Sequence, residues 1–165
     1  MMRRRSGGAT LVELVITIVI INVAIAGVVG AFALLVGRSA DPLNQTRAIA
    51  LAQLYADEIL ARRYDDSTPP GGVPRWSGCT INPEEASRAN YDDVDDYQAI
   101  SGGPPTDAAG VSLDATAYQG FTVSISVACA GAEVALPDID AKRVDITIQD
   151  PSGNAYLFTL YRANY

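Results

Sequence analysis

Apolar side chains are concentrated at the start of the chain, and most acidic side chains lie in its later part. From Leu14 to Val36 the sequence contains no charged residue, and about 20 consecutive apolar residues are enough for a helix to cross a bilayer. Residues 9–36 are therefore predicted to form a hydrophobic membrane-spanning helix. Because Arg3, Arg4 and Arg5 precede it, the positive-inside bias places the N-terminus in the cytoplasm and the rest of the chain outside.

Residues 37–64 are predicted to continue this helix in amphipathic form. Asp41-Pro42 indicates a break or kink, since the residue before a proline avoids the helical region. The segment that follows is rich in strong helix formers. Apolar residues recur in it at helical spacing and predict the face that packs under a small domain. The members of this stripe are Leu43, Thr46, Ala50, Leu54 and Ile59.

The remainder of the chain is predicted to be a loop-rich region, 65–119, followed by an antiparallel sheet, 120–165. Three segments in the second part alternate apolar and polar residues with the period of a half-buried strand. These segments are 120–127, 143–149 and 156–161, the last two joined by a turn at 150–154. A helix followed by a sheet predicts an α+β fold, in which the long N-terminal helix packs against three or four strands.

Composition narrows the classes of function. The chain has 12 basic and 19 acidic residues, a net charge of −7, and such a chain repels the phosphate backbone of nucleic acids. It has no histidine, which is the commonest general base and the commonest zinc ligand. Because no catalytic or phosphate-binding motif is recognisable either, the sequence predicts a protein that is not an enzyme and uses no cofactor.

Three interpretations compete for the N-terminal segment. A cleaved secretory signal would have a shorter apolar run of about 7–15 residues and a small-residue cut site, for which Ala40-Asp41-Pro42 is a poor match. A plain membrane anchor fits the length, but gives no reason for Gly7-Gly8 or for an acid at Glu13. The third interpretation is a basic leader, residues 1–8, that is cut off directly ahead of the apolar run, which is retained. It accounts for all of these features.

The run from Gly8 to Val15 resembles the N-terminal signal of the type IV pilin-like superfamily. In that family a membrane aspartyl peptidase cleaves after the glycine and methylates the new first residue. The resemblance implies cleavage between Gly8 and Ala9, N-methylation of Ala9, and an assembly role for Glu13, the fifth residue after the cut. The family usually has Phe or Met where this chain has Ala9. It also implies a pilin-like fold, with a long N-terminal helix on a small sheet.

Glu13 has a physical cost that calls for a reason. A carboxylate near the start of a bilayer helix costs roughly 2.5–3.5 kcal/mol on insertion scales. The assembly interpretation pairs it with the N-terminal amine of Ala9 in a neighbouring subunit, which offsets the burial of both charges. The alternative is an acid that reaches back to the membrane interface.

The resemblance implies a structural subunit, a minor pilin. Residues 36–42 and the acidic run at 92–97 are also similar to the MshD-type minor pilins of mannose-sensitive haemagglutinin pili. The implied partners are other pilin subunits through the N-terminal helix, prepilin peptidase, the inner-membrane assembly platform and the lipid bilayer. The implied location is the inner membrane with the C-terminal domain periplasmic, and later the pilus at the cell surface. The alternatives are a minor pseudopilin of type II secretion and a non-polymerising single-pass protein with a periplasmic binding domain.

Two further features carry candidate chemistry. Cys79 and Cys129 would face an oxidising compartment in this topology, which favours a disulfide over free thiols or a metal pair. It would tie the loop-rich region to the first strand.

The acidic run offers hard oxygen ligands to calcium, although it lacks the order of an EF-hand loop. The residues concerned are Asp92, Asp93, Asp95 and Asp96. Because acidic runs on soluble domains are commonly solvated, the sequence favours no metal and keeps calcium as the alternative.

Overall fold

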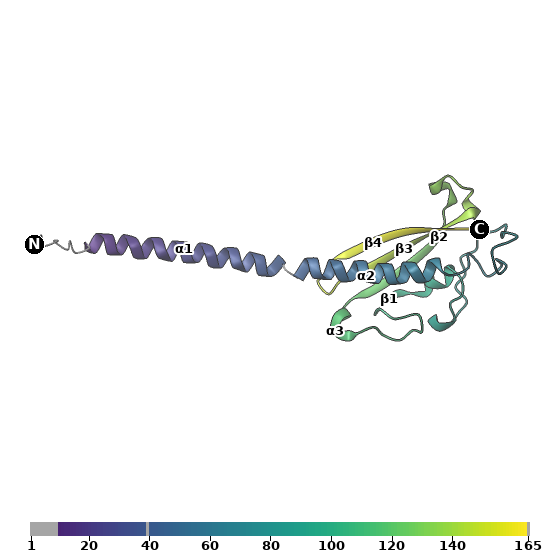
Figure 1. The fold of residues 1–165 in the computed structure, drawn as a ribbon, viewed down its shortest axis with the longest axis horizontal. Coiled ribbons are helices and arrows are strands. Elements are labelled where there is room, and N and C mark those ends of the chain that lie inside the picture. Colours follow the sequence, from purple (N-terminus) through teal and green to yellow (C-terminus); the bar gives the residue numbers. More distant parts are fainter. Residues whose placement is uncertain (1–9, 39, 165) are drawn as a thin grey trace, which may run out of the picture. The chain divides into compact units, whose positions relative to one another are not determined.

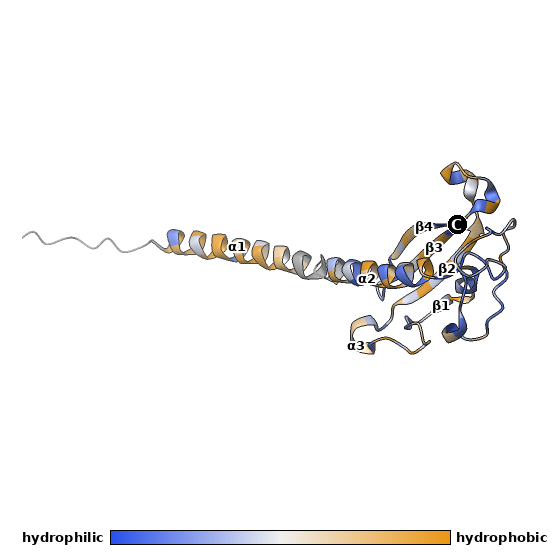
Figure 2. Ribbon diagram, turned by 45° about the vertical axis from the view of Figure 1, so that its right-hand side comes forward, coloured by the Kyte–Doolittle hydropathy of each residue, from blue (hydrophilic) through white to orange (hydrophobic). Residues whose placement is uncertain are grey.

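The computed structural model describes residues 10–38 and 40–164, without the side chains of 34–41 (Figure 1). The chain divides into two compact units, one ending at Leu43 and one beginning at Asn44. The first contains the helix α1, Leu11–Arg38. The segment Leu11–Ala33 is long and apolar enough to cross a membrane, by length and composition. Figure 2 shows the hydrophobic residues along α1.

The helix α2 extends over Ala40–Leu60. The boundary between α1 and α2 therefore precedes the predicted break at Asp41-Pro42. Pro42 lies in the first turn of α2, where its missing N–H costs no helical hydrogen bond. The helix ends before the predicted Tyr64, because the backbone N–H of Arg63 donates to the carbonyl of Asp92 instead of continuing the helical ladder.

The buried face of α2 differs from the predicted one. Leu43 and Leu54 are 52% and 40% exposed, and only Ile59 of the predicted stripe is buried. The buried residues are Asn44, Ala48, Leu51, Ala52, Tyr55 and Ile59. Apolar residues occur at helical spacing on both sides of this Ala/Leu-rich helix, so the pattern alone does not select a face. The large Tyr55 side chain, whose hydroxyl accepts the N–H of Thr106 at 3.0 Å, lies on the side that packs against the sheet.

The second unit contains a four-stranded antiparallel sheet in the order β1-β2-β3-β4. Its strands are β1 (Ser101–Gly103), β2 (Thr122–Cys129), β3 (Ala141–Gln149) and β4 (Ala155–Ala163). The α+β class and the three predicted strands are confirmed. The short β1 was not predicted, since it falls in a Gly/Pro-rich connector. Its register with β2 is irregular, and Gly102 has a positive φ of 69° that glycine adopts readily.

The predicted loop-rich region has some regular structure of its own. Besides β1 it contains the one-turn helix α3, Ala115–Tyr118. Two short 3-10 helices also lie in it, at Arg88–Asn90 and Asp95–Ala99. Two more, Gly131–Val134 and Asp138–Asp140, connect β2 to β3.

The core lies between α2 and one face of the sheet. Every second residue of a strand faces the core, and the core-facing residues of neighbouring strands form rows across the sheet. Ile125, Ile146 and Phe158 form one such row. Ile125 and Ile146 belong to one buried cluster with Leu51 and Tyr55 of α2, and Phe158 packs against it. In Figure 1, α2 lies across the sheet. The two-residue period of the strands therefore supplies one half of the core and the helix supplies the other.

The packing predicts a clear difference between two strand residues. Ile146 is fully buried and Leu157 is 65% exposed. Ile146→Ala should lower the free energy of unfolding by about 2–5 kcal/mol, because it removes buried methyl groups and leaves a cavity. Leu157→Ala, the matched control, should change it by less than about 0.5 kcal/mol. Urea denaturation measures both values, and equal losses would contradict this core.

Candidate functional site

Of the predicted processing and assembly residues, the structure describes Glu13 alone. Gly8 and Ala9 lie outside the described residues. Glu13 is in the first turn of α1, where its N–H donates to the Thr10 hydroxyl at 3.3 Å and its carbonyl accepts from the Thr17 hydroxyl at 2.7 Å. The first of these bonds is the capping contact that starts a helix.

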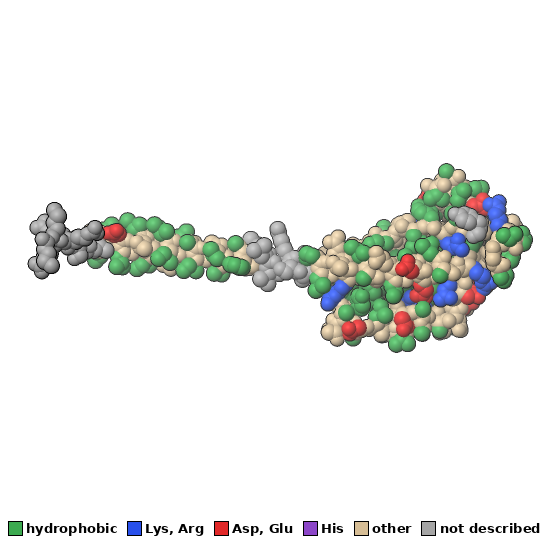
Figure 3. Space-filling model, viewed as in Figure 1, with side chains coloured by type: hydrophobic (Ala, Val, Ile, Leu, Met, Phe, Trp, Pro, Cys, Tyr) green, Lys and Arg blue, Asp and Glu red, His purple; other side chains and the backbone are tan. Residues whose placement is uncertain are grey.

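Glu13 is the one acidic residue of α1, and the other residues from Leu11 to Ala33 are apolar apart from Thr17 and Asn22. Within the part of the chain that the structure describes, no cation lies within salt-bridge distance of its carboxylate. The apolar side chains from Leu11 to Ala33 are exposed, and Figure 3 shows hydrophobic side chains covering α1. The helix therefore offers an apolar surface with one negative charge near its N-terminus.

The predicted disulfide is confirmed. Cys79 and Cys129 are bonded, with their Cα atoms 6.2 Å apart and a sequence separation of 50. The bond joins the loop after α2 to the last residue of β2. In the chain-entropy model, closing a loop of this length stabilises the fold by roughly 4 kcal/mol.

A buried lysine lies beside the acidic run. Lys142 on β3 is fully buried, and its ammonium group pairs with Asp95 and, at 3.4 Å, with Asp65. A buried charge is costly unless it is paired. Lys142 shares the two-residue period of Val144 and Ile146, so it points to the same buried face of the sheet. This spacing is a signal in the sequence for an internal cation, and Lys142 was not among the predicted site residues.

The expectation that the acidic run is solvated is wrong for Asp93, Asp95 and Asp96, which are buried. Their carboxylates bind backbone N–H groups. Asp93 accepts from the N–H groups of Asp95, Asp96 and Asp66, at 3.0, 3.3 and 2.8 Å. Asp95 accepts from the N–H of Asn82 at 2.7 Å. The run thus folds into a turn held by its own side chains.

The four carboxylates of the predicted calcium set do not form one group. Asp93 and Asp95 lie with Asp65, beside Lys142. Asp92 and Asp96 fall in other carboxylate groups, which include Asp66, Glu84 and Glu85. The ammonium group of Lys142 already supplies a cation to the first of these groups.

A second internal ion pair links the same region to α2. Arg88 is buried, and its guanidinium group donates to Glu58 at 2.7 Å and lies 4.2 Å from the centre of the Tyr55 ring. The hydroxyl of Tyr97, the residue directly after Asp96, donates to the other carboxylate oxygen of Glu58 at 2.7 Å. The acidic region is therefore held to the sheet through Lys142 and to α2 through Arg88, and both of these cationic residues are buried.

Several acids in this region have displaced pKa values. A hydrogen bond shared with the carboxyl group of Asp66 raises the pKa of Glu84 to about 7, and one shared with the carboxyl group of Asp96 raises the pKa of Glu85 to about 7. Burial, followed by the charge of Asp95, raises the pKa of Asp93 to about 8.

Asp65 shows the opposite effect. Burial disfavours its charge, but hydrogen bonds from Thr80 and Ser67 and the ammonium group of Lys142 outweigh that penalty and lower its pKa.

The raised pKa values predict how stability depends on pH. Acids whose pKa is higher in the folded chain bind more protons there than in the unfolded chain, so the free energy of unfolding falls as pH rises between their unfolded and folded values. Denaturation without divalent cations should therefore give lower stability at about pH 8 than at about pH 5.5. The double variant Glu84→Gln, Glu85→Gln should flatten this dependence, and an unchanged slope would contradict the assignment.

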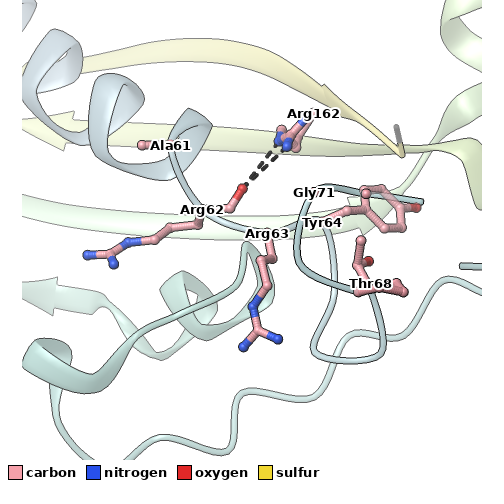
Figure 4. A pocket seen from close by; sticks show the side chains of 9 residues that line it. Ala61, Arg62, Arg63, Tyr64, Thr68, Gly71 and Arg162 are labelled. Atoms are coloured by element: carbon pink, nitrogen blue, oxygen red, sulfur yellow. Dashed lines mark hydrogen bonds between the residues drawn. The ribbon is translucent and has the colours of Figure 1, made fainter. Parts of the chain in front are cut away.

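A cavity of about 310 Å³ lies beside the end of α2 (Figure 4). The guanidinium group of Arg162 donates to the carbonyls of Arg62 and Ala163, and that of Arg63 points away and binds Asp66 and Asp92. The hydroxyl of Thr68 is buried without a partner in the described part of the chain. Because the arginines are directed to the protein's own oxygen atoms, the cavity does not present a ready anion site.

Comparison with models of protein families, with curated proteins and with solved structures gives no match. Function is therefore inferred from the residues of this chain.

Proposed function

We propose that this chain is a minor pilin, a structural subunit of a type IV-like pilus of the MshD type. Prepilin peptidase would remove residues 1–8, and the N-terminal helix would then carry the subunit from the inner membrane into the filament. The observation that carries the proposal is Glu13, a lone carboxylate in the first turn of an apolar helix, five residues after Gly8.

The apolar surface of α1 gives the first supporting argument. Its side chains from Leu11 to Ala33 are exposed, and an apolar surface of this extent is unfavourable in water. A bilayer covers such a helix before assembly. In a filament, the helices of neighbouring subunits would cover it instead.

The charge of Glu13 gives the second argument. Cleavage after Gly8 creates a new amine at Ala9, and a buried carboxylate is tolerated when a cation pairs with it. An amine from a neighbouring subunit meets this need at the moment of assembly. A plain membrane anchor would leave both Gly8 and Glu13 without a purpose.

The second unit suits an oxidising compartment outside the cytoplasm. Its disulfide, Cys79–Cys129, is of the kind that persists in the periplasm and at cell surfaces. By the positive-inside rule, the arginine-rich start of the chain would stay in the cytoplasm and the second unit would lie outside it. These two independent features agree on one topology.

Processing and assembly can be tested separately. Mass spectrometry of the membrane-extracted protein should find a mature N-terminus at Ala9. Glu13→Ala should be cleaved normally but lost from sheared filaments, because it lacks the charge that pairs with the neighbouring amine. Thr17→Ala, one turn further along the helix, is the matched control and should still enter filaments.

Two outcomes would overturn the proposal. An intact start at Met1 or Met2 would favour the non-polymerising membrane protein, and normal incorporation of Glu13→Ala would remove the assembly role. Deletion of the whole chain, with pili and protein secretion scored side by side, separates the remaining alternative. Loss of pili with normal secretion supports a minor pilin, whereas loss of secretion with normal pili supports a pseudopilin of type II secretion.

A further inference from the structure

Five carboxylates from three separate segments meet beside the acidic run. They form two groups that share Glu85, and the ligand oxygens in each group lie within 4.8 Å of one another. We call these residues the Glu85 cluster: Asp66, Glu84, Glu85, Asp92 and Asp96. Asp66 follows α2, the two glutamates lie in the middle of the loop, and the remaining two belong to the acidic run.

The Glu85 cluster has less compensating charge than its neighbour. The adjacent group of Asp65, Asp93 and Asp95 has Lys142 against it. Among the described residues, the cation paired with the Glu85 cluster is Arg63, which binds Asp66 at 3.2 Å and also Asp92. One guanidinium group thus faces five carboxylates.

Three carboxylate oxygens of the cluster are buried and, when the acids are ionised, lack a hydrogen-bond donor in the described chain. They are Oε2 of Glu85, Oδ1 of Asp92 and Oδ1 of Asp96. Asp96 is fully buried, and its Oδ2 accepts the N–H groups of Asp92 and Asp93 at 3.0 and 3.3 Å. Its Oδ1 is therefore the oxygen left for a ligand. Buried oxygens without donors are rare in folded proteins and point to an ion or a water.

We propose that the Glu85 cluster binds a calcium ion. The donor set consists of hard carboxylate oxygens without nitrogen or sulfur, which suits Ca²⁺. Calcium bonds of roughly 2.3–2.6 Å allow ligands on opposite sides to be about 5 Å apart, whereas Mg²⁺ requires a tighter octahedron. The ion supplies the positive charge that these oxygens lack.

This site differs from the calcium set predicted from the sequence. It keeps Asp92 and Asp96, whereas Asp93 and Asp95 face Lys142 instead. The new members, Asp66, Glu84 and Glu85, are distant from the run in sequence and meet it only in the folded chain. A bound ion would therefore join the turn after α2, the middle of the loop and the acidic run.

The acid–base properties of the cluster agree with a cation site. Neighbouring carboxylates raise the pKa of Glu84 and Glu85 to about 7, and a bound cation reverses this by favouring the charged forms. Protons and Ca²⁺ should therefore compete, and the affinity for Ca²⁺ should fall as pH decreases below about 7.

The test uses the full chain in detergent micelles, treated with EDTA and titrated with CaCl₂ at about pH 7.5. Calorimetry should show one Ca²⁺ per chain. At a free Ca²⁺ concentration a hundred times the Kd, the Tm should rise by roughly 10 °C. Glu85→Gln should weaken Ca²⁺ binding about tenfold or more, since the charge of the ligands sets the affinity. Asp57→Asn, an exposed carboxylate on α2, is the matched control and should bind normally.

Glu85→Gln also distinguishes a lost ligand from a damaged fold. In EDTA its Tm should equal or exceed that of the wild type, because repulsion with Asp96 is removed. The proposal is overturned if roughly 5 mM Ca²⁺ produces neither heat nor a shift in Tm, a concentration above the Kd of typical extracellular calcium modules. It is also overturned if Glu85→Gln responds like the wild type, or if Mg²⁺ at equal concentration raises the Tm as much as Ca²⁺.

Discussion

The second unit depends on the ion pairs that the buried ammonium group of Lys142 forms with two aspartates. The lysine lies on the core face of β3 and pairs with Asp65 and Asp95. Asp65 lies in the segment that follows α2, and Asp95 belongs to the acidic run. These acids bind the loop between them, since Asp65 accepts from Thr80 and Asp95 from the N–H of Asn82. The loop is thus attached to the sheet by one cation and, next to Thr80, by the disulfide.

Much of the fold was predictable because its signals are local. Three strands follow the two-residue period, and the apolar run gives α1. The buried face of α2 was not predictable, because Leu54 and Leu51 are equally apolar and the sheet selects between them. The burial of Asp93 and Asp96 was missed since it depends on backbone N–H groups brought together by the fold. Lys142 could have been found, because it has the spacing of Val144 on the same strand.

The two parts of the chain satisfy the same physical requirement in different ways. A charge in apolar surroundings needs a partner. Lys142 finds its partners within the chain, so it stabilises the fold. Glu13 has none among the described residues of its own chain, and under the proposed function its partner is the amine of Ala9 in another subunit. The chain would then carry one charge for folding and another for assembly.

A double-mutant cycle on Lys142 and Asp95 tests most directly whether buried charge pairing holds the acidic region on the sheet. Lys142→Met and Asp95→Asn should each lower the free energy of unfolding by about 3–5 kcal/mol, because each leaves a buried partner uncompensated. The double variant should lose less than the sum, with a coupling energy of about 1–3 kcal/mol. Additive losses would show that the two side chains act independently and would contradict this explanation of the fold.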